Sequence, residues 1–274
     1  MAESLVELKT KCALAHRILT MTGSMGDITG HVMVRIPGTN EFLYRCRNDR
    51  DDVSPAYCTP RSMHRMALNT GDPLDPLADG YRVSGERFIG LTVMNVRPEV
   101  NCVIHAHPPA QVLCSITGVE LQSIVGSQNW AGSFLTRPGI GVYPRSLTIV
   151  NHVLGQAMLR VMGNKDVVLL YGHGNVVAGR SVEDATVKAV RVENLARLCW
   201  QLAVQQRSNK PLWEIPWEDW DDMTSGAGIR EALEAQGASE VTLGETGNWD
   251  YYVQMLQDGA EIPEECSPNG FRQY

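Results

Sequence analysis

Apolar and polar residues recur along the chain with alternating helical and strand periods, an order that is typical of an α/β protein. Within residues 1–20 the apolar side chains follow a helical period, and Ser4 and Glu7 form the sequence of a capping box. We therefore expect an amphipathic N-terminal helix rather than a signal peptide. Two strand-like runs, 32–36 and 41–45, flank a Pro-Gly-Thr-Asn turn and predict a hairpin.

The middle of the chain is expected to alternate helices with strands. A charged, proline-containing loop is expected over 48–60, and a helix expected over 84–97 is ended by Pro98. Mostly apolar runs predict the remaining elements of this part, which are strands over 100–107, 120–126, 139–143 and 167–171, and a helix over roughly 146–162. His16, His64 and His152 fall in predicted helices without a partner pattern and receive no role.

A long helix is expected from the capping sequence of Ser181 and Asp184 to about residue 206. After Lys210 the composition becomes rich in Trp, acidic residues, Gly and Pro. We interpret 1–210 as one α/β domain and 211–274 as a C-terminal extension that packs on this core or on a neighbouring subunit. Within the extension, short helices are expected over 229–236 and 248–257.

Composition and charge narrow the class of partner. The 274 residues carry a formal net charge of −7 and no run of basic residues, which argues against nucleic acid or an anionic membrane as a partner. No apolar stretch approaches the ~20 residues of a membrane-spanning helix. Seven scattered cysteines without a Cys-x-x-Cys pair favour reduced thiols in a cytoplasmic protein over a disulfide framework. The expected partner is a small molecule.

Three histidines stand where predicted strands end. His105 and His107 are separated by one residue, so a strand would turn both imidazoles to the same side before two prolines end it. His173 follows another apolar run and can complete the set. Three nitrogen donors with an open coordination position are typical of a catalytic metal site. Unrelated polar residues at strand ends are the alternative interpretation.

These histidines and their surroundings resemble the class II aldolase/adducin family over about residues 5–206. The resemblance rests on Gly26-Asp27-Ile28-Thr29-Gly30-His31, on Glu86 ahead of Arg97-Pro98-Glu99-Val100, on His105-Ala106-His107-Pro108 and on Tyr171-Gly172-His173-Gly174. It implies a three-layer α/β/α fold with a central, largely antiparallel sheet, in which 1–210 is the catalytic domain. It also implies homotetramers with active sites at subunit boundaries, and one divalent ion per subunit bound by His105, His107 and His173.

Glu86 is the acid that the resemblance places beside the metal as an acid/base catalyst. From the sequence alone it lies near the start of a predicted helix behind Ser84, where the helix dipole favours a carboxylate. A solvated capping role is therefore the alternative. The predicted chemistry requires a proton carrier next to the metal, which favours the catalytic role.

Departures from the sugar-phosphate members of the family bear on the substrate. Asp27 stands where those members usually carry Asn, and a carboxylate beside a phosphate dianion adds repulsion and removes a hydrogen-bond donor. Arg137 and Arg145 lie in loops expected near the strand ends that carry the histidines, and arginine suits bidentate carboxylate binding. We therefore predict a carboxylate substrate bound by these two residues; surface arginines without a ligand are the alternative.

Four stretches resemble the branch of this family that contains metal-dependent decarboxylases of hydroxylated aromatic or pyridine dicarboxylates. They are the two motifs that hold His31 and His107, a Tyr-Pro-Arg-Ser run from Tyr143 and a Trp-Asp-Tyr-Tyr run from Trp249. The resemblance implies a carboxy-lyase that removes one of two vicinal carboxylates through an enolate-like carbanion stabilised by Mn²⁺. Zn²⁺, Co²⁺ or Fe²⁺ can fill the same ligands. His31 and Tyr171 are further candidate contacts to the substrate.

Three alternatives remain. An aldolase or epimerase acting on an unphosphorylated hydroxy-carbonyl compound would use similar carbanion chemistry and release no gas. An iron-dependent oxygenase would consume oxygen. A catalytically silent interaction module, as in the adducin relatives, would have no reason to keep Glu86 and three convergent histidines.

Overall fold

The computed structural model describes residues 4–26, 28–48, 53–78, 80–122, 135–136, 138–206 and 247–259. A seven-stranded sheet in the order β4-β2-β1-β6-β9-β8-β7 forms its centre, and every neighbouring pair is antiparallel except β7 and β8. Its strands are β1 (His31–Arg35), β2 (Glu41–Arg45), β4 (Met63–Ala67), β6 (Cys102–Ala106), β7 (Gly141–Tyr143), β8 (Val167–Leu170) and β9 (Gly174–Gly179). A separate ribbon pairs β3 (Arg47–Asn48) with β5 (Tyr81–Arg82).

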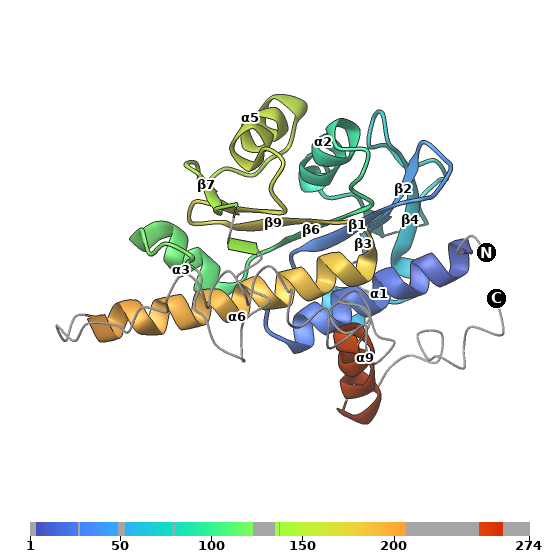
Figure 1. Cartoon of the computed structure of the whole chain (residues 1–274). Coiled ribbons are helices and arrows are strands. Elements are labelled where there is room, and N and C mark those ends of the chain that lie inside the picture. Colours follow the sequence, from blue (N-terminus) through green and yellow to red (C-terminus); the bar gives the residue numbers. More distant parts are fainter. Residues whose placement is uncertain are drawn as a thin grey trace, which may run out of the picture.

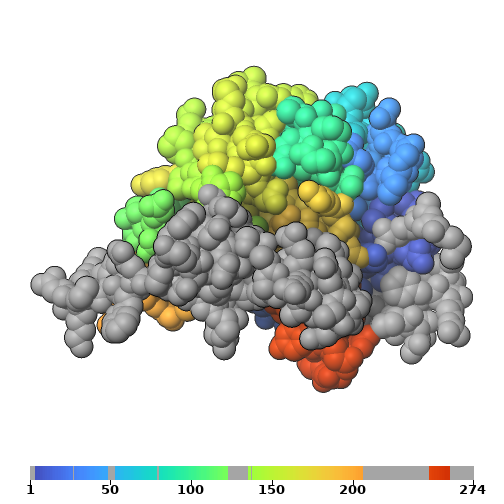
Figure 2. Space-filling view, in the orientation of Figure 1, coloured from blue at the N-terminus to red at the C-terminus, as the bar shows by residue number. Residues whose placement is uncertain are grey.

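Helices cover both faces of the sheet, which confirms the predicted three-layer fold (Figure 1). Helices α2 (Phe88–Val96) and α5 (His152–Met162) lie on one face and form the upper surface in Figure 2. Helices α1 (Leu5–Met21), α3 (Pro109–Thr117) and α6 (Val182–Gln206) lie on the other, and α9 (Gly247–Gly259) packs against α1 and α6. Short 3-10 turns are η1 (Pro55–Tyr57), η2 (Pro60–Ser62) and η3 (Gly85–Arg87).

The two hydrophobic cores follow from the alternation of side chains along the central strands. In β1, Val32 and Val34 join the core under α1 and α6, whereas Met33 between them joins the core under α2 and α5. The strand is therefore apolar at consecutive positions. Such continuous apolar runs are expected when both faces of a sheet are covered by helices.

Several predicted elements are confirmed. The side chain of Ser4 accepts the Glu7 amide at 3.2 Å and the Glu7 carboxylate accepts the Ser4 amide at 2.7 Å, which is the predicted capping box of α1. The hairpin of β1 and β2, the strand β8 and the long helix α6 also lie where they were expected. In the C-terminal extension α9 matches the helix predicted over 248–257, and its Trp249 and Leu256 join the core of α1 and α6.

Other predictions were wrong or incomplete. The helix expected over 146–162 begins only at His152, because Asn151 caps it by accepting the Leu154 amide at 3.0 Å. His64 lies in strand β4 rather than in a helix. Residues 120–122 of the strand expected over 120–126 are not in a strand, and the rest of that strand lies outside the described residues, as does the helix expected over 229–236.

Helix α3 and strand β9 were not predicted. Pro109 was interpreted only as the end of a strand, but it occupies the first turn of α3, where the missing N–H of proline is not needed. Strand β9 begins and ends with glycine, which weakens a strand signal in the sequence. None of the helices in the described parts of the chain is long and apolar enough to cross a membrane.

His16 is a buried link between α1 and β1. Its Nε2 accepts the Val32 amide at 3.0 Å, and its Nδ1 lies 2.8 Å from the Cys12 carbonyl, to which it donates. Burial is the main cause that lowers the pKa of His16 to about 3, and the charge of Arg45 adds to it. The residue is therefore neutral in the folded protein at neutral pH.

We predict that His16 makes the protein less stable as the pH falls. The unfolded chain binds a proton at His16 below pH ~6.5 while the folded protein does not, so its contribution is lost at about 1.4 kcal/mol per pH unit until the pH approaches the folded pKa. The free energy of unfolding in urea, measured on EDTA-treated wild type and His16→Gln, should differ most at pH 8. The difference should shrink between pH 6.5 and 5. A constant difference would contradict this linkage.

Candidate metal centre

The structure brings the four predicted ionisable residues into one cluster. His105 lies in β6 and His107 just beyond its end, His173 lies in the turn between β8 and β9, and Glu86 lies in η3. One potential ligand atom from each residue lies within 4.8 Å of the other three. Residues from three separate parts of the chain thus converge at one end of the central strands.

The distances within this cluster fit a single metal ion. Nε2 of His105 lies 3.1 Å from Nε2 of His107 and 3.6 Å from a carboxylate oxygen of Glu86, and Nε2 of His173 lies 3.2 Å from the other oxygen. Atoms that bind one ion tetrahedrally at ~2.1 Å lie about 3.4 Å apart. The observed separations bracket this value.

The orientation of His105 is fixed by a hydrogen bond on the far side of its ring. Its Nδ1 lies 2.7 Å from the carbonyl oxygen of Asn175, and since a carbonyl only accepts, Nδ1 carries the hydrogen. The lone pair of a neutral ring is then on Nε2, which faces His107 and Glu86. This is the arrangement of metal-binding histidines whose other ring nitrogen is held by a carbonyl.

Two further observations support a cation at this point. The buried Oε1 of Glu86 has no hydrogen bond of suitable geometry among the described residues, although Nε2 of His173 lies 3.2 Å from it. Buried polar atoms are normally paired, so this exception calls for an explanation such as a bound ion. Three imidazole nitrogens and a carboxylate oxygen suit a divalent transition metal.

The charge states of the cluster also suit an ion. Burial raises the pKa of the Glu86 carboxyl, but the rings of His105 and His173 lower it more, and the net pKa lies well below its usual range. Burial, with repulsion from the two other histidines of the cluster, lowers the pKa of His107 to about 4. An ionised carboxylate and a neutral imidazole are the forms that bind metals.

Glycines allow the close approach of the chain segments. Gly172 has a φ of +60°, a left-handed conformation that glycine adopts without strain, and it lies in the three-residue turn that presents His173. A Cβ on Gly174 would lie 2.1 Å from the carbonyl oxygen of Ala106 and 2.9 Å from the ring of His107. The Gly-His-Gly sequence therefore serves the packing of β9 against β6 as well as the turn.

A buried polar network supports the cluster from behind. The side chain of Asn175 accepts the Ala106 amide at 3.2 Å and donates to Gln111 at 2.8 Å. Glu193 lies in α6 and is 1% exposed. Its carboxylate accepts hydrogen bonds from the backbone amide of Gln111, at the start of α3, and from the Gln111 side-chain amide at 3.4 Å. The helix dipole favours this carboxylate. The network could not be predicted from the sequence because helix α3 was not.

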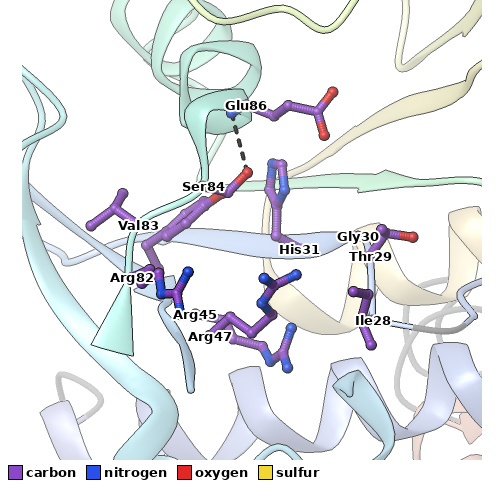
Figure 3. Close-up of a pocket in the computed structure, with 11 residues that line it drawn as sticks. Ile28, Thr29, Gly30, His31, Arg45, Arg47, Arg82, Val83, Ser84 and Glu86 are labelled. Carbon is purple, nitrogen blue, oxygen red and sulfur yellow. Dashed lines mark hydrogen bonds between the residues drawn. The ribbon is translucent and has the colours of Figure 1, made fainter. Parts of the chain in front are cut away.

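A cavity of about 280 Å³ adjoins the cluster (Figure 3). It shares Glu86 with the cluster, and Thr29 in its lining contacts Nδ1 of His107 at 3.0 Å. His31 also lines it, lies opposite His105 in the β1–β6 register and has its ring centroid 5.3 Å from that of His105. In Figure 3 the ring of His31 points toward Glu86. The described residues of its lining are Ile28, Thr29, Gly30, His31, Tyr44, Arg45, Arg47, Arg82, Val83, Ser84 and Glu86.

The arginines of this cavity differ from those that the sequence analysis selected. Arg45, Arg47 and Arg82 line it, whereas Arg145 is exposed in the loop after β7 and is not part of the lining. Arg137 lies outside the described residues. The alternation of Arg45 and Arg47 at the end of a predicted strand is the signal that could have found two of these side chains. Tyr171 is 44% exposed and precedes His173 by two residues.

Comparison with known proteins identifies the class. Residues 10–200 match the family described as the Class II Aldolase and Adducin N-terminal domain, and the chain belongs to this family. This confirms the resemblance found in the sequence.

Two relatives of the chain are named for the same enzyme activity. The chain is 37% identical over 211 residues to a 3,4-dihydroxyphthalate decarboxylase of Arthrobacter keyseri, covering 74% of this chain and 84% of the relative. It is 32% identical over 212 residues to the protein of the same name from Rhodococcus jostii (strain RHA1), covering 77% and 85%. The solved structure of an aldolase II superfamily protein from Pseudomonas syringae is similar in fold, with a TM-score of 0.73 and 18% identity. The match covers 95% of this chain and 96% of that protein.

We predict that His105→Ala and His173→Ala each remove the bound ion. Loss of one of three nitrogen donors should weaken binding by at least about 100-fold, more than the 10–100-fold typical of outer-shell changes. Metal content after dialysis, measured by elemental analysis, should fall from one ion per chain to near zero, while His152→Ala, in the first turn of α5, should keep the ion. Stoichiometric metal in both cluster variants would contradict the ligand assignment.

We predict a smaller effect for the network behind the cluster. Gln111→Leu leaves the amide of Asn175 without its acceptor, so His105 and the strand end should be held less well. The affinity for the ion should fall about 10–100-fold. Competition with a chelator measures this, and a thermal melt of the metal-free variant separates the effect from a general loss of stability. Unchanged affinity would show that the network only stabilises the fold.

Proposed function

We propose that this protein is a divalent-metal-dependent decarboxylase that removes one carboxylate from a hydroxylated aromatic vicinal dicarboxylate. One observation carries the proposal: Glu86 belongs both to the histidine cluster and to the lining of the adjoining cavity. A substrate in this cavity would therefore lie next to both the ion and Glu86, the candidate proton carrier. The relatives named 3,4-dihydroxyphthalate decarboxylase support this reaction and this ring type.

His105, His107 and His173 would hold the ion through their Nε2 atoms. When bound, the ion supplies a Lewis acid that stabilises the negative charge left on the substrate after the carbon–carbon bond breaks. The protein's part is to keep the three rings converged, through the Asn175 carbonyl on His105 and the Thr29 hydroxyl on His107. These contacts set the ring orientations before any ligand arrives.

Glu86 is our candidate for the proton carrier. Its carboxylate is ionised at neutral pH, so it can accept the proton of a ring hydroxyl as that group becomes a phenolate. Carbon dioxide then leaves, the electron pair of the broken bond stays on the ring carbon, and the protonated Glu86 delivers its proton there. The product is left as a phenolate that takes one proton from the solvent, so the net reaction exchanges one carboxylate for one hydrogen.

Other residues are proposed to contact the substrate. His31 faces the cavity, and Tyr171 lies close to His173 in the chain; both remain proposals for hydrogen bonding or ring contact. Arg145 and Arg137 also remain proposals, with Arg145 able to approach only from the exposed loop after β7. In an assembly these residues could act at a subunit boundary.

We further propose one ion per subunit, a homotetramer and a cytoplasmic location. Mn²⁺ is the first ion to test because the oxygens of the substrate would add hard ligands to the three nitrogens. Exposed apolar side chains near the site, Val150 beside Gly85 and Ile116 beside Gly172, support a subunit contact there. The six cysteines within the described residues are buried and none of them forms a disulfide, as suits a reducing compartment.

We predict metal-dependent release of carbon dioxide from one member of a panel of hydroxylated phthalates and hydroxypyridine dicarboxylates. The panel should be tested with Mn²⁺-loaded protein, EDTA-treated protein and the Glu86→Gln variant. Because the variant cannot carry the proton, its kcat should be about 10²–10⁴-fold lower. No release from any member by protein that retains its ion would contradict the proposal and direct the search to hydroxy-carbonyl substrates. Full activity of Glu86→Gln would contradict only the role of Glu86.

A further inference from the structure

Three arginine side chains from different strands line the cavity beside the cluster. Arg47 in β3 and Arg82 in β5 are direct partners in the antiparallel ribbon, where like charges opposite each other are destabilising. Arg45, which is 5% exposed, lines the same cavity. Glu86 is the single carboxylate among the described residues of the lining.

These arginines lie apart from the catalytic cluster but share its cavity. Figure 3 shows their guanidinium groups on the side of His31 away from Glu86. The Ser84 hydroxyl lies on the Glu86 side of these groups, and it accepts the Glu86 amide at 3.2 Å. The volume of about 280 Å³ is near the lower end of the range for small-molecule pockets, which suits a compound with one ring.

We propose that Arg45, Arg47 and Arg82 bind the carboxylate that the substrate keeps. This rests on the proposed decarboxylation and adds which end of the substrate lies where. Guanidinium groups bind carboxylates with paired, charge-assisted hydrogen bonds and stabilise the anion. A carboxylate that leaves as neutral carbon dioxide loses its negative charge, so strong binding by arginines would oppose its departure. The leaving carboxylate therefore lies at the Glu86 end of the cavity and the retained one at the arginine end.

The arrangement also explains a requirement for two carboxylates. A ring with a single carboxylate can place this group at the arginine end, and then no carboxylate lies near Glu86 to leave as carbon dioxide. It can also place the group at the Glu86 end, and then no carboxylate binds the arginines. The end of the cavity lined by Arg45, Arg47 and Arg82, the arginine pocket, thus selects a vicinal dicarboxylate over a monocarboxylate. Guanidinium groups also bind phosphate with paired hydrogen bonds, so phosphate is the competing ligand that the test must include.

The test measures binding of phthalate, which has both carboxylates and no ring hydroxyl, to Mn²⁺-loaded protein by calorimetry. Arg47→Gln and Arg82→Gln should each raise the Kd about 10–100-fold, as expected for a lost charge-assisted bond. Arg47→Lys, which keeps the charge without the fork, should lose less. Arg160→Gln changes an exposed arginine of α5 and serves as the matched control. Metal content and thermal melts should be unchanged in all variants.

Several results would overturn the proposal. Wild-type protein that does not bind phthalate, equal Kd values for wild type and both pocket variants, or tighter binding of inorganic phosphate than of phthalate would each do so. A loss of phthalate binding in Arg145→Gln with none in the pocket variants would move the carboxylate site to the loop after β7. Because phthalate needs no turnover, dependence of its binding on Arg47 and Arg82 would stand even if no panel compound released carbon dioxide.

Turnover distinguishes the retained carboxylate from the leaving one. If the arginines hold the retained group, Arg47→Gln should raise KM for the active panel compound about as much as it raises the Kd of phthalate, with kcat nearly unchanged. If they held the leaving group, removing its stabilisation should raise kcat. An increased kcat would therefore overturn the assignment of the two ends.

Discussion

The register of β6 between β1 and β9 is the constraint on which the site depends. It places His105 opposite His31 on one side and opposite Val176 on the other, with its ring held by the carbonyl of Asn175. A shift of one residue in this pairing would turn His105 to the other face of the sheet, because side chains alternate along a strand. Apolar side chains packed on both faces of these strands oppose such a shift.

The core of the sheet and the histidine cluster both depend on this register, but they require different things of it. The core needs only apolar residues of suitable size at alternating positions. The cluster needs particular atoms at separations of about 3 Å, and it reaches them at the strand end, where β6 stops before two prolines and the β8–β9 turn is closed by a left-handed glycine. Rigid strands up to the last residue, followed by tight turns, give the side chains fixed positions without a long loop.

The sequence indicated those features that are local in the chain. His105 and His107 share a strand and His173 ends another, so their spacing predicted a common side, and the family resemblance added Glu86. The arginine pocket could not be found in this way, because Arg47 and Arg82 meet only through a ribbon of two-residue strands. The network behind the cluster was missed for a related reason: Glu193 acts on an amide of α3, and the prolines had suggested an end rather than a helix start. The overall negative charge likewise gave no hint of a cationic cavity, because net charge says nothing about where charges lie.

The ribbon of β3 and β5 is hydrogen-bonded to itself and is not a member of the main sheet. The histidines are carried by the sheet, whereas two of the three arginines are carried by this ribbon. Residues of the ribbon can therefore be exchanged in evolution or by design while the strands that carry the histidine cluster stay unchanged. A family that breaks carbon–carbon bonds in chemically different acids and sugars would need such a division, with a fixed reactive end and a replaceable end that fits the rest of the molecule.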